Sequence, residues 1–167
     1  MNKNRDFEWG GIYLQDPSEG LMYQVWEAVL QDDNVLLKSE TTPEFIAYTG
    51  ANITEISFAF DQNMNFTLAF VQDGVAKLHW YDSAVSGFTT TSFGSSVISP
   101  KVSLDDKRPK QSAIADVIFT YVKNGNLYYR QQRDRFTVEY LLDDSGIINR
   151  IKKFGMNNKL RLQWQVE

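Results

Sequence analysis

The stretch TEISFAFDQNMNFTLAFVQDGVAKLHWY, residues 54–81, decides the fold class. Apolar residues take alternate positions in two successive runs: Ile56, Phe58 and Phe60, and then Phe66, Leu68 and Phe70. An alternation of period 2 is typical of a β-strand with one buried face. Asp73-Gly74 follows the second run, and Asp-Gly favours a tight hairpin turn because both residues accept positive φ. The stretch therefore predicts three antiparallel strands.

The same unit recurs as VIFTYVKNGNLYYRQ, residues 117–131. Here Asn124-Gly125 takes the place of Asp73-Gly74, and the two turn glycines are 51 residues apart. This spacing is close to that of a four-stranded propeller blade or of another repeated sheet module.

Weaker hairpin patterns flank the two strong ones. Residues 24–30 and 35–40 surround one turn, and residues 147–156 and 159–166 surround Asn157-Asn158. Three polar segments are predicted as loops: residues 16–20, 83–94 and 99–110, the last with room for a short strand at 102–104. No apolar stripe of helical period is sustained. We therefore predict an all-β single domain, residues 1–167, of antiparallel hairpin repeats that are propeller-blade-like or sandwich sheets, with residues 1–20 as a docking arm.

Composition excludes several classes of function. The chain has no cysteine, which removes disulfides, thiolate metal sites and cysteine nucleophiles. Its N-terminus lacks the apolar core of a signal peptide, and no apolar run approaches the roughly 20 residues of a membrane helix. The net charge of −4 gives no general attraction to nucleic acid. We expect synthesis in a cytoplasm and neither a membrane nor a nucleic-acid partner.

Charge is unevenly distributed along the chain. Residues 1–100 hold 4 Lys/Arg against 13 Asp/Glu, a net −9, whereas residues 101–167 hold 13 against 8, a net +5. This asymmetry favours head-to-tail packing of subunits, although two independently solvated faces would look the same.

Catalytic patterns are weak. His79 is the one histidine, and its sequence neighbourhood offers only Asp82 as a partner. The acidic pairs Asp32-Asp33, Asp105-Asp106 and Asp143-Asp144 lie in loop-like segments, where Asp is common because it hydrogen-bonds nearby backbone. Residues 61–65 begin like a calcium loop but lack its Gly and its final Glu, so we predict a turn. The sequence predicts no enzyme, no cofactor and no metal site.

A basic and aromatic cluster is the strongest candidate for a binding site. Its members are Tyr128, Tyr129, Arg130, Arg133, Arg135 and Phe136. Arg and aromatic residues are enriched at protein interface hot spots, and they also stack on nucleic-acid bases. Because the chain is acidic overall, we predict a protein interface here.

Several segments resemble a family of virion structural proteins from tailed bacteriophages and prophages. The most specific segment is LYYRQQRDRF, residues 127–136, within a resembling stretch that begins at Asn124; the others are residues 58–64, 71–78, 105–109, 115–118 and 155–157. The resemblance runs from about Met22 to the C-terminus. It implies a structural component of the virion, in the tail, tail tip or fibre-attachment region, made in the bacterial host cytoplasm. It implies contacts with other virion proteins and a homo-oligomer, ring or fibre assembly, and it supplies no catalytic residues.

Two other functions remain open. Trp80, Tyr81 and Phe88 are candidates for stacking on sugar rings, which would make the chain a receptor- or glycan-binding module of the tail. The third function is that of a cell-wall or capsule hydrolase, although the sequence offers no catalytic constellation for it.

Overall fold

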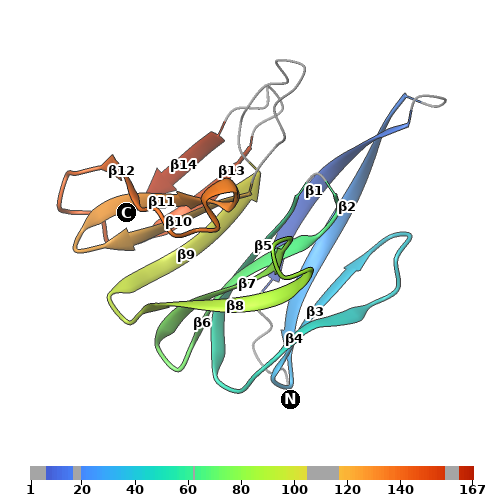
Figure 1. The fold of residues 1–167 in the computed structure, drawn as a ribbon, viewed down its shortest axis with the longest axis horizontal. Helices are drawn as coiled ribbons and strands as arrows, with labels where there is room; N and C mark the ends of the chain where they lie inside the picture. The colour runs from blue at the N-terminus through green and yellow to red at the C-terminus, as the bar shows by residue number, and fades with distance from the viewer. Residues whose placement is uncertain (1–6, 17–19, 62, 105–116, 157–161) are drawn as a thin grey trace.

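The computed structural model describes residues 7–16, 20–61, 63–104, 117–156 and 162–167. Regular structure in these residues is β-strand apart from one 3₁₀ turn, which confirms the all-β prediction. The strands form three four-stranded antiparallel sheets and one two-stranded sheet (Figure 1).

The first sheet contains β1 (Phe7–Asp16), β2 (Gly20–Gln31), β3 (Asn34–Ser39) and β4 (Phe45–Thr49), in that order. Asp32 and Asp33 form the β2–β3 turn with φ of 48° and 65°, as the hairpin pattern predicts. Residues 7–16, inside the predicted docking arm, are an edge strand of this sheet. The predicted turn at residues 16–20 lies largely outside the described residues.

The second sheet contains β5 (Ile53–Phe60), β6 (Phe66–Gln72), β7 (Val75–Asp82) and β8 (Gly87–Gly94). The third contains β9 (Val97–Leu104), β10 (Val117–Lys123), β11 (Asn126–Gln131) and β12 (Tyr140–Asp143), with the 3₁₀ turn η1 (Gln132–Asp134). The fourth contains β13 (Ile151–Met156) and β14 (Leu162–Val166).

Each four-stranded sheet is an up-and-down meander of consecutive strands, the connectivity of one propeller blade. Gly74 and Gly125 occupy matching turns between the two central strands of the second and third sheets, and both have a φ of 75°. The repeat predicted from the two glycines is therefore present. The first sheet repeats the unit at its Asp32-Asp33 turn.

The structure corrects the prediction of a loop at residues 83–94, because β8 covers most of that segment. Its Ser, Thr and Gly content favours a loop, but the β-branched run Thr89-Thr90-Thr91 fits a pleated strand. The strand β9 is also longer than the predicted residues 102–104.

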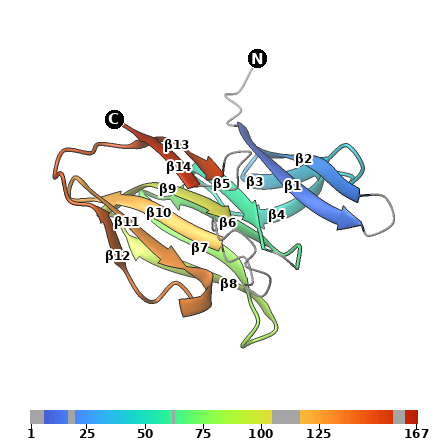
Figure 2. The same cartoon turned by 90° about the horizontal axis from the view of Figure 1, so that it is seen from above.

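The sheets stack face to face in chain order (Figures 1 and 2). One core cluster lies between the first and second sheets and includes Trp26, Leu37, Phe58 and Phe70. A second cluster, between the second and third sheets, contains side chains such as Leu78, Trp80, Phe119 and Tyr121. A third cluster, made of Val122, Leu127, Ile148 and Ile151, joins the third sheet to the fourth.

The first strands of neighbouring sheets approach one another, since β5 contacts both β1 and β9 and β9 also contacts β13. Buried serines connect them. The Ser57 hydroxyl on β5 accepts a hydrogen bond from the Val102 amide on β9 at 3.1 Å. The Ser99 hydroxyl accepts one from the Ile151 amide at 2.9 Å and donates one to the Ile151 carbonyl at 3.2 Å.

The two turn glycines allow a matched stability test. An added Cβ would meet nothing within 4 Å at Gly74, but at Gly125 it would clash with the backbone carbonyl of Gly146. We expect Gly74→Ala to lower the free energy of unfolding by about 1 kcal/mol, the cost of positive φ. Gly125→Ala should cost about 3 kcal/mol, because backbone must also move. Urea unfolding of both variants measures the difference, and equal losses would contradict the close approach of Gly146.

Candidate functional site

The six predicted interface residues are divided between the two faces of the third sheet. Tyr128 pairs with Tyr121, and Arg130 pairs with Phe119, across β10 and β11. Both partners belong to the core cluster between the second and third sheets, so Tyr128 and Arg130 face the second sheet. Tyr129 alternates with them and faces the opposite way.

Phe136 is directed back into the stack by an unusual turn. After η1, Arg135 and Phe136 both have left-handed backbone, with φ of 51° and 55°. The amides of these two residues donate to the carbonyls of Gln132 and Gln131, respectively. This reversal places the Phe136 ring edge-on to Trp80, with ring centroids 5.0 Å apart.

Two residues predicted to be binding residues, Phe136 and Trp80, are buried in the structure. Phe136 is 1% exposed and Trp80 is 4% exposed, and each fills space between the second and third sheets. The Trp80 indole N–H also donates to the Thr91 hydroxyl at 3.3 Å. Phe136 is therefore a core residue rather than part of an exposed interface, and Trp80 offers no free ring for a sugar.

Arg130 holds the same turn in place. Its Nε donates to the Tyr121 hydroxyl at 2.8 Å, and its Nη1 donates to the carbonyls of Phe136 and Thr137, each at 2.9 Å. Its Nη2 lies 3.2 Å from Glu139 Oε2. The guanidinium therefore anchors the turn within the subunit, a role that the sequence pattern does not reveal.

Ring contacts complete the Arg130 environment. Its guanidinium carbon lies 5.2 Å from the Phe93 ring centroid and 5.9 Å from that of Tyr121. Cations within about 6 Å of a ring face are attracted by its quadrupole. Tyr128 stacks near Tyr121 and lies under Lys123, so it too belongs to this internal cluster.

Glu139 is the acceptor at the centre of the network. Its Oε2 accepts from the Tyr121 hydroxyl at 2.5 Å, and its Oε1 lies 3.1 Å from Lys123 Nζ. Burial opposes ionisation of Glu139, but hydrogen bonds from Tyr121 and Lys123 and the charges of Lys123 and Arg130 outweigh it and lower its pKa. Burial and the bond to Glu139 raise the pKa of Tyr121.

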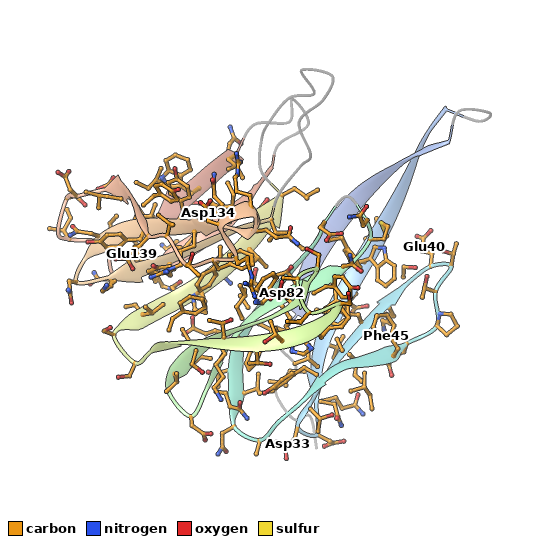
Figure 3. All side chains as sticks on the ribbon, viewed as in Figure 1. Asp33, Glu40, Phe45, Asp82, Asp134 and Glu139 are labelled. Atoms are coloured by element: carbon orange, nitrogen blue, oxygen red, sulfur yellow. The ribbon has the colours of Figure 1, made fainter. Side chains whose placement is uncertain are left out.

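Arg135 forms an ion pair that connects the third sheet to the second. Its Nη2 lies 2.5 Å from Asp82 Oδ2, and this carboxylate is almost inaccessible to solvent. Figure 3 shows Asp82 between the second and third sheets. The hydrogen bond from Arg135 lowers the pKa of Asp82 against the effect of burial.

Three members of the predicted cluster reach the surface: Arg133 and Arg135 are exposed, and Tyr129 is half-buried. The Tyr129 ring stacks on Tyr140 of β12, with centroids 5.0 Å apart and planes at 19°. The Tyr140 hydroxyl donates to Asp134 Oδ2 at 2.8 Å, which raises the pKa of Tyr140.

Two exposed apolar side chains lie in the C-terminal part of the chain. Ile147 is 78% exposed and Trp164 of β14 is 44% exposed, whereas the exposed Leu141 pairs with Tyr128 and therefore lies on the face toward the second sheet. We name the residues Tyr129, Arg133, Tyr140, Ile147 and Trp164 the C-terminal surface. The sequence signal for most of it is weak, because β12 has no clear alternation and Trp164 reads as an ordinary strand residue.

The alternative sugar-stacking residues are separated by the sheet. Tyr81 and Phe88 lie on the face of the second sheet opposite Trp80, with ring centroids 5.6 Å apart. Phe88 is 44% exposed and stacks on Phe66 at 4.5 Å and on His79 at 5.2 Å. Strand alternation in the sequence indicates that His79 and Tyr81 share a face. That Phe66 lies on the same face follows only from the pairing of β6 with β7.

His79 has a packing role in this aromatic group. Its Nδ1 lies 2.9 Å from the Thr90 hydroxyl, and its ring contacts those of Tyr48 and Phe88. Burial lowers the pKa of His79.

Several carboxylates considered for catalysis or metal binding make local structural contacts, and Asp143 Oδ1 of the Asp143-Asp144 pair accepts from the Ser145 amide. Asp61 Oδ1 accepts from the amides of Asn63 and Asn65, and its Oδ2 accepts from Gln132 Nε2. This geometry is the turn that residues 61–65 predict. Asp32-Asp33 forms a hairpin turn, and Asp105-Asp106 lies outside the described residues. Within the described ranges, no group of three or more His, Cys, Asp or Glu is placed to hold a metal ion.

Comparison with known proteins finds no protein-family model, no curated protein and no solved structure that matches the chain. In the part of the chain that the structure describes, no helix is long and apolar enough to cross a membrane.

The Glu139 network predicts a specific pH dependence of stability. Because its pKa is lower in the folded than in the unfolded state, its contribution is complete above the unfolded value of about 4.3 and is lost as pH falls. We expect Glu139→Gln to reduce the free energy of unfolding by about 1 kcal/mol at pH 7. The loss should shrink as the pH is lowered toward 3.

Urea unfolding at pH 7, 5 and 3 measures this effect. Glu40→Gln is the matched control, since Glu40 is an exposed carboxylate at the end of the first sheet's third strand (Figure 3). A deficit for Glu139→Gln that is the same at every pH would contradict the assigned role of the charge.

Proposed function

We propose that this protein is a non-enzymatic structural component of a tailed-bacteriophage particle, in the tail, tail tip or fibre-attachment region. It acts through contacts with other virion proteins. The virion context comes from the resemblance of LYYRQQRDRF and its companion segments. The C-terminal surface is the observation that supports action through contacts.

The C-terminal surface has the chemistry of an assembly interface. Large apolar side chains are usually buried, and clusters that stay exposed mark interaction sites. Here Ile147, Trp164 and Arg133 are exposed, and Tyr129 stacks on Tyr140 on the face away from the second sheet. Aromatic residues and Arg are also the types that contribute most binding energy at interfaces. The buried residues of LYYRQQRDRF then have a supporting role, because Arg130 and Phe136 fix the turn that follows Arg133.

A double variant tests the surface. We expect Tyr129→Ala with Arg133→Ala to leave a folded subunit that no longer enters particles, because each such anchor contributes about 2 kcal/mol or more when an interface buries it. Complementation of a phage lacking the wild-type gene, followed by mass spectrometry of purified particles, measures incorporation. The circular dichroism spectrum and urea midpoint check folding.

Tyr81→Ala with Phe88→Ala is the matched control, since it removes an aromatic pair from another face. This control should enter particles normally. Normal incorporation of Tyr129→Ala with Arg133→Ala would remove the C-terminal surface from the proposal. Absence of the wild-type chain from particles, while it is abundant in infected cells, would overturn the virion role itself.

A receptor- or glycan-binding module is the second candidate, and the exposure of Phe88 favours it. Its ring is supported from below by Phe66 and His79, so it presents a fixed apolar platform beside Tyr81. Binding of the purified protein to host cells or to a glycan array, lost in Tyr81→Ala with Phe88→Ala, would support this function.

A further inference from the structure

The first sheet carries a projecting two-stranded arm. Strand β2 pairs with β3 from Trp26 to Gln31, whereas it pairs with β1 as far as Gly20. Residues 11–16 and 20–25 are therefore hydrogen-bonded to each other and to no other described strand, and we name them the arm. Figure 1 shows this end of β1 and β2 extending beyond β3 and β4.

The composition of the arm is unlike that of a solvated hairpin. Its two strands read GIYLQD and GLMYQV, with no Lys or Arg. A two-stranded hairpin is at best marginally stable in water unless other strands or a packed face support it. Long apolar arms with unpaired edges also favour aggregation, which proteins avoid by covering them. The arm therefore has the properties of a segment that binds another surface.

Among the described residues, the fourth sheet has fewer strands than the other three. It consists of β13 and β14, whereas each of the other three has four strands, and β14 pairs with β13 alone among the described strands. Strand β13 contacts β9, the edge strand of the third sheet. If two more strands followed β14 in the fourth sheet, as in the other sheets, they would lie over β11 and β12. That position holds Tyr129 and Tyr140, and Trp164 of β14 is exposed.

Charge favours contact between these two regions. Residues 7–25 contain Glu8, Asp16 and Glu19 and no basic residue, a net charge of −3, with Asp16 inside the arm and the other two beside it in the sequence. Residues 147–167 contain five Lys or Arg and Glu167, a net charge of +4. Of the basic residues, Arg150, Lys152 and Lys153 are exposed. Opposite charges of this kind select and orient partners even where they add little affinity.

We propose that two copies of the chain bind one another by strand addition, with the arm of one copy pairing along β14 of the other. Two arm strands and the β13–β14 hairpin then form a four-stranded sheet like the other three. The added strands supply backbone hydrogen bonds along residues 163–166 of β14, on the edge where no described strand pairs with it, and they cover Tyr129, Tyr140 and Trp164. The inference builds on the proposed function, because it names a second copy as the partner of the C-terminal surface.

Cross-linking between differently marked copies tests this contact. The wild-type chain has no cysteine, so introduced cysteines are its only thiols. One chain carries Gln15→Cys on β1 or Gln24→Cys on β2, and a tagged chain carries Gln165→Cys on β14. A disulfide requires Cα atoms within about 7 Å, so a mixed disulfide under mild oxidation reports proximity of arm and hairpin. Asp33→Cys, in the exposed β2–β3 turn, replaces the arm cysteine in the control.

We expect one of the two arm cysteines to form a mixed disulfide with Gln165→Cys at least ten times faster than the control does. Light scattering on the unmodified chain should give twice the subunit mass of 19.2 kDa or a multiple of that dimer. Association should weaken as salt rises, because the charges lie at the surface.

A subunit mass of 19.2 kDa at micromolar concentration would overturn the inference. A dimer whose arm cysteines react no faster than the control would also overturn it, since the copies would then meet elsewhere. Both results are independent of particle composition. A monomeric chain found in particles would refute the arm contact and leave the virion role standing. A cross-linked dimer that is absent from particles would refute the virion role and leave the arm contact standing.

Discussion

The central strands of the second and third sheets are buried on both faces, and the rest of the structure depends on this constraint. Residues 67–70 of β6 and 117–122 of β10 are buried at every position. In β6, Leu68 and Phe70 pack against the first sheet, while Ala69 packs toward the third. A strand buried on both sides requires a layer on each side, so the second sheet can exist only within a stack.

The buried serines explain how the layers keep a fixed position relative to one another. Apolar contact between sheets is non-directional and would tolerate sliding. The Ser57 and Ser99 hydroxyls are directional, and each would be costly to leave unpaired because both are buried. Irregular pairing in β5 and β9 accompanies them, with positive φ at Glu55 and at Ser99 itself. A bulge re-aims a side chain, and here it turns a hydroxyl toward the next sheet.

Sequence reasoning predicts the parts of the fold that local physics determines. Asp73-Gly74 and Asn124-Gly125 define hairpins because the turn conformation is a property of the residues in it. The short edge strands β4 and β12 leave no such signal. Edge strands pair on one side only, so their residues need not alternate, and their existence depends on the neighbouring strand that offers them hydrogen bonds.

For the candidate site, the sequence predicts even less of the structure than it does for the edge strands. LYYRQQRDRF is recognisable as a cluster of Arg and aromatic residues, but its sequence does not show which side chains are exposed. The deciding feature is left-handed backbone at Arg135 and Phe136. Bulky residues adopt positive φ rarely, and tertiary contacts must stabilise it. Those contacts come from Arg130, Trp80 and Asp82, which are distant in sequence or hidden in the same cluster.

The third sheet faces the second sheet on one side and the fourth sheet on the other, and the two gaps are filled differently. Toward the second sheet, Trp80 and Phe136 fill the outer part of the gap, and Arg130 satisfies the carbonyls of the turn. On the opposite face, the corresponding outer strands present Tyr129 and Tyr140, and the fourth sheet has two described strands instead of four. The same repeating unit thus closes one gap from within the subunit and leaves aromatic rings available in the other. Because a layer in this fold is buried only by the next layer, a protein partner that supplies strands is the natural complement of that surface.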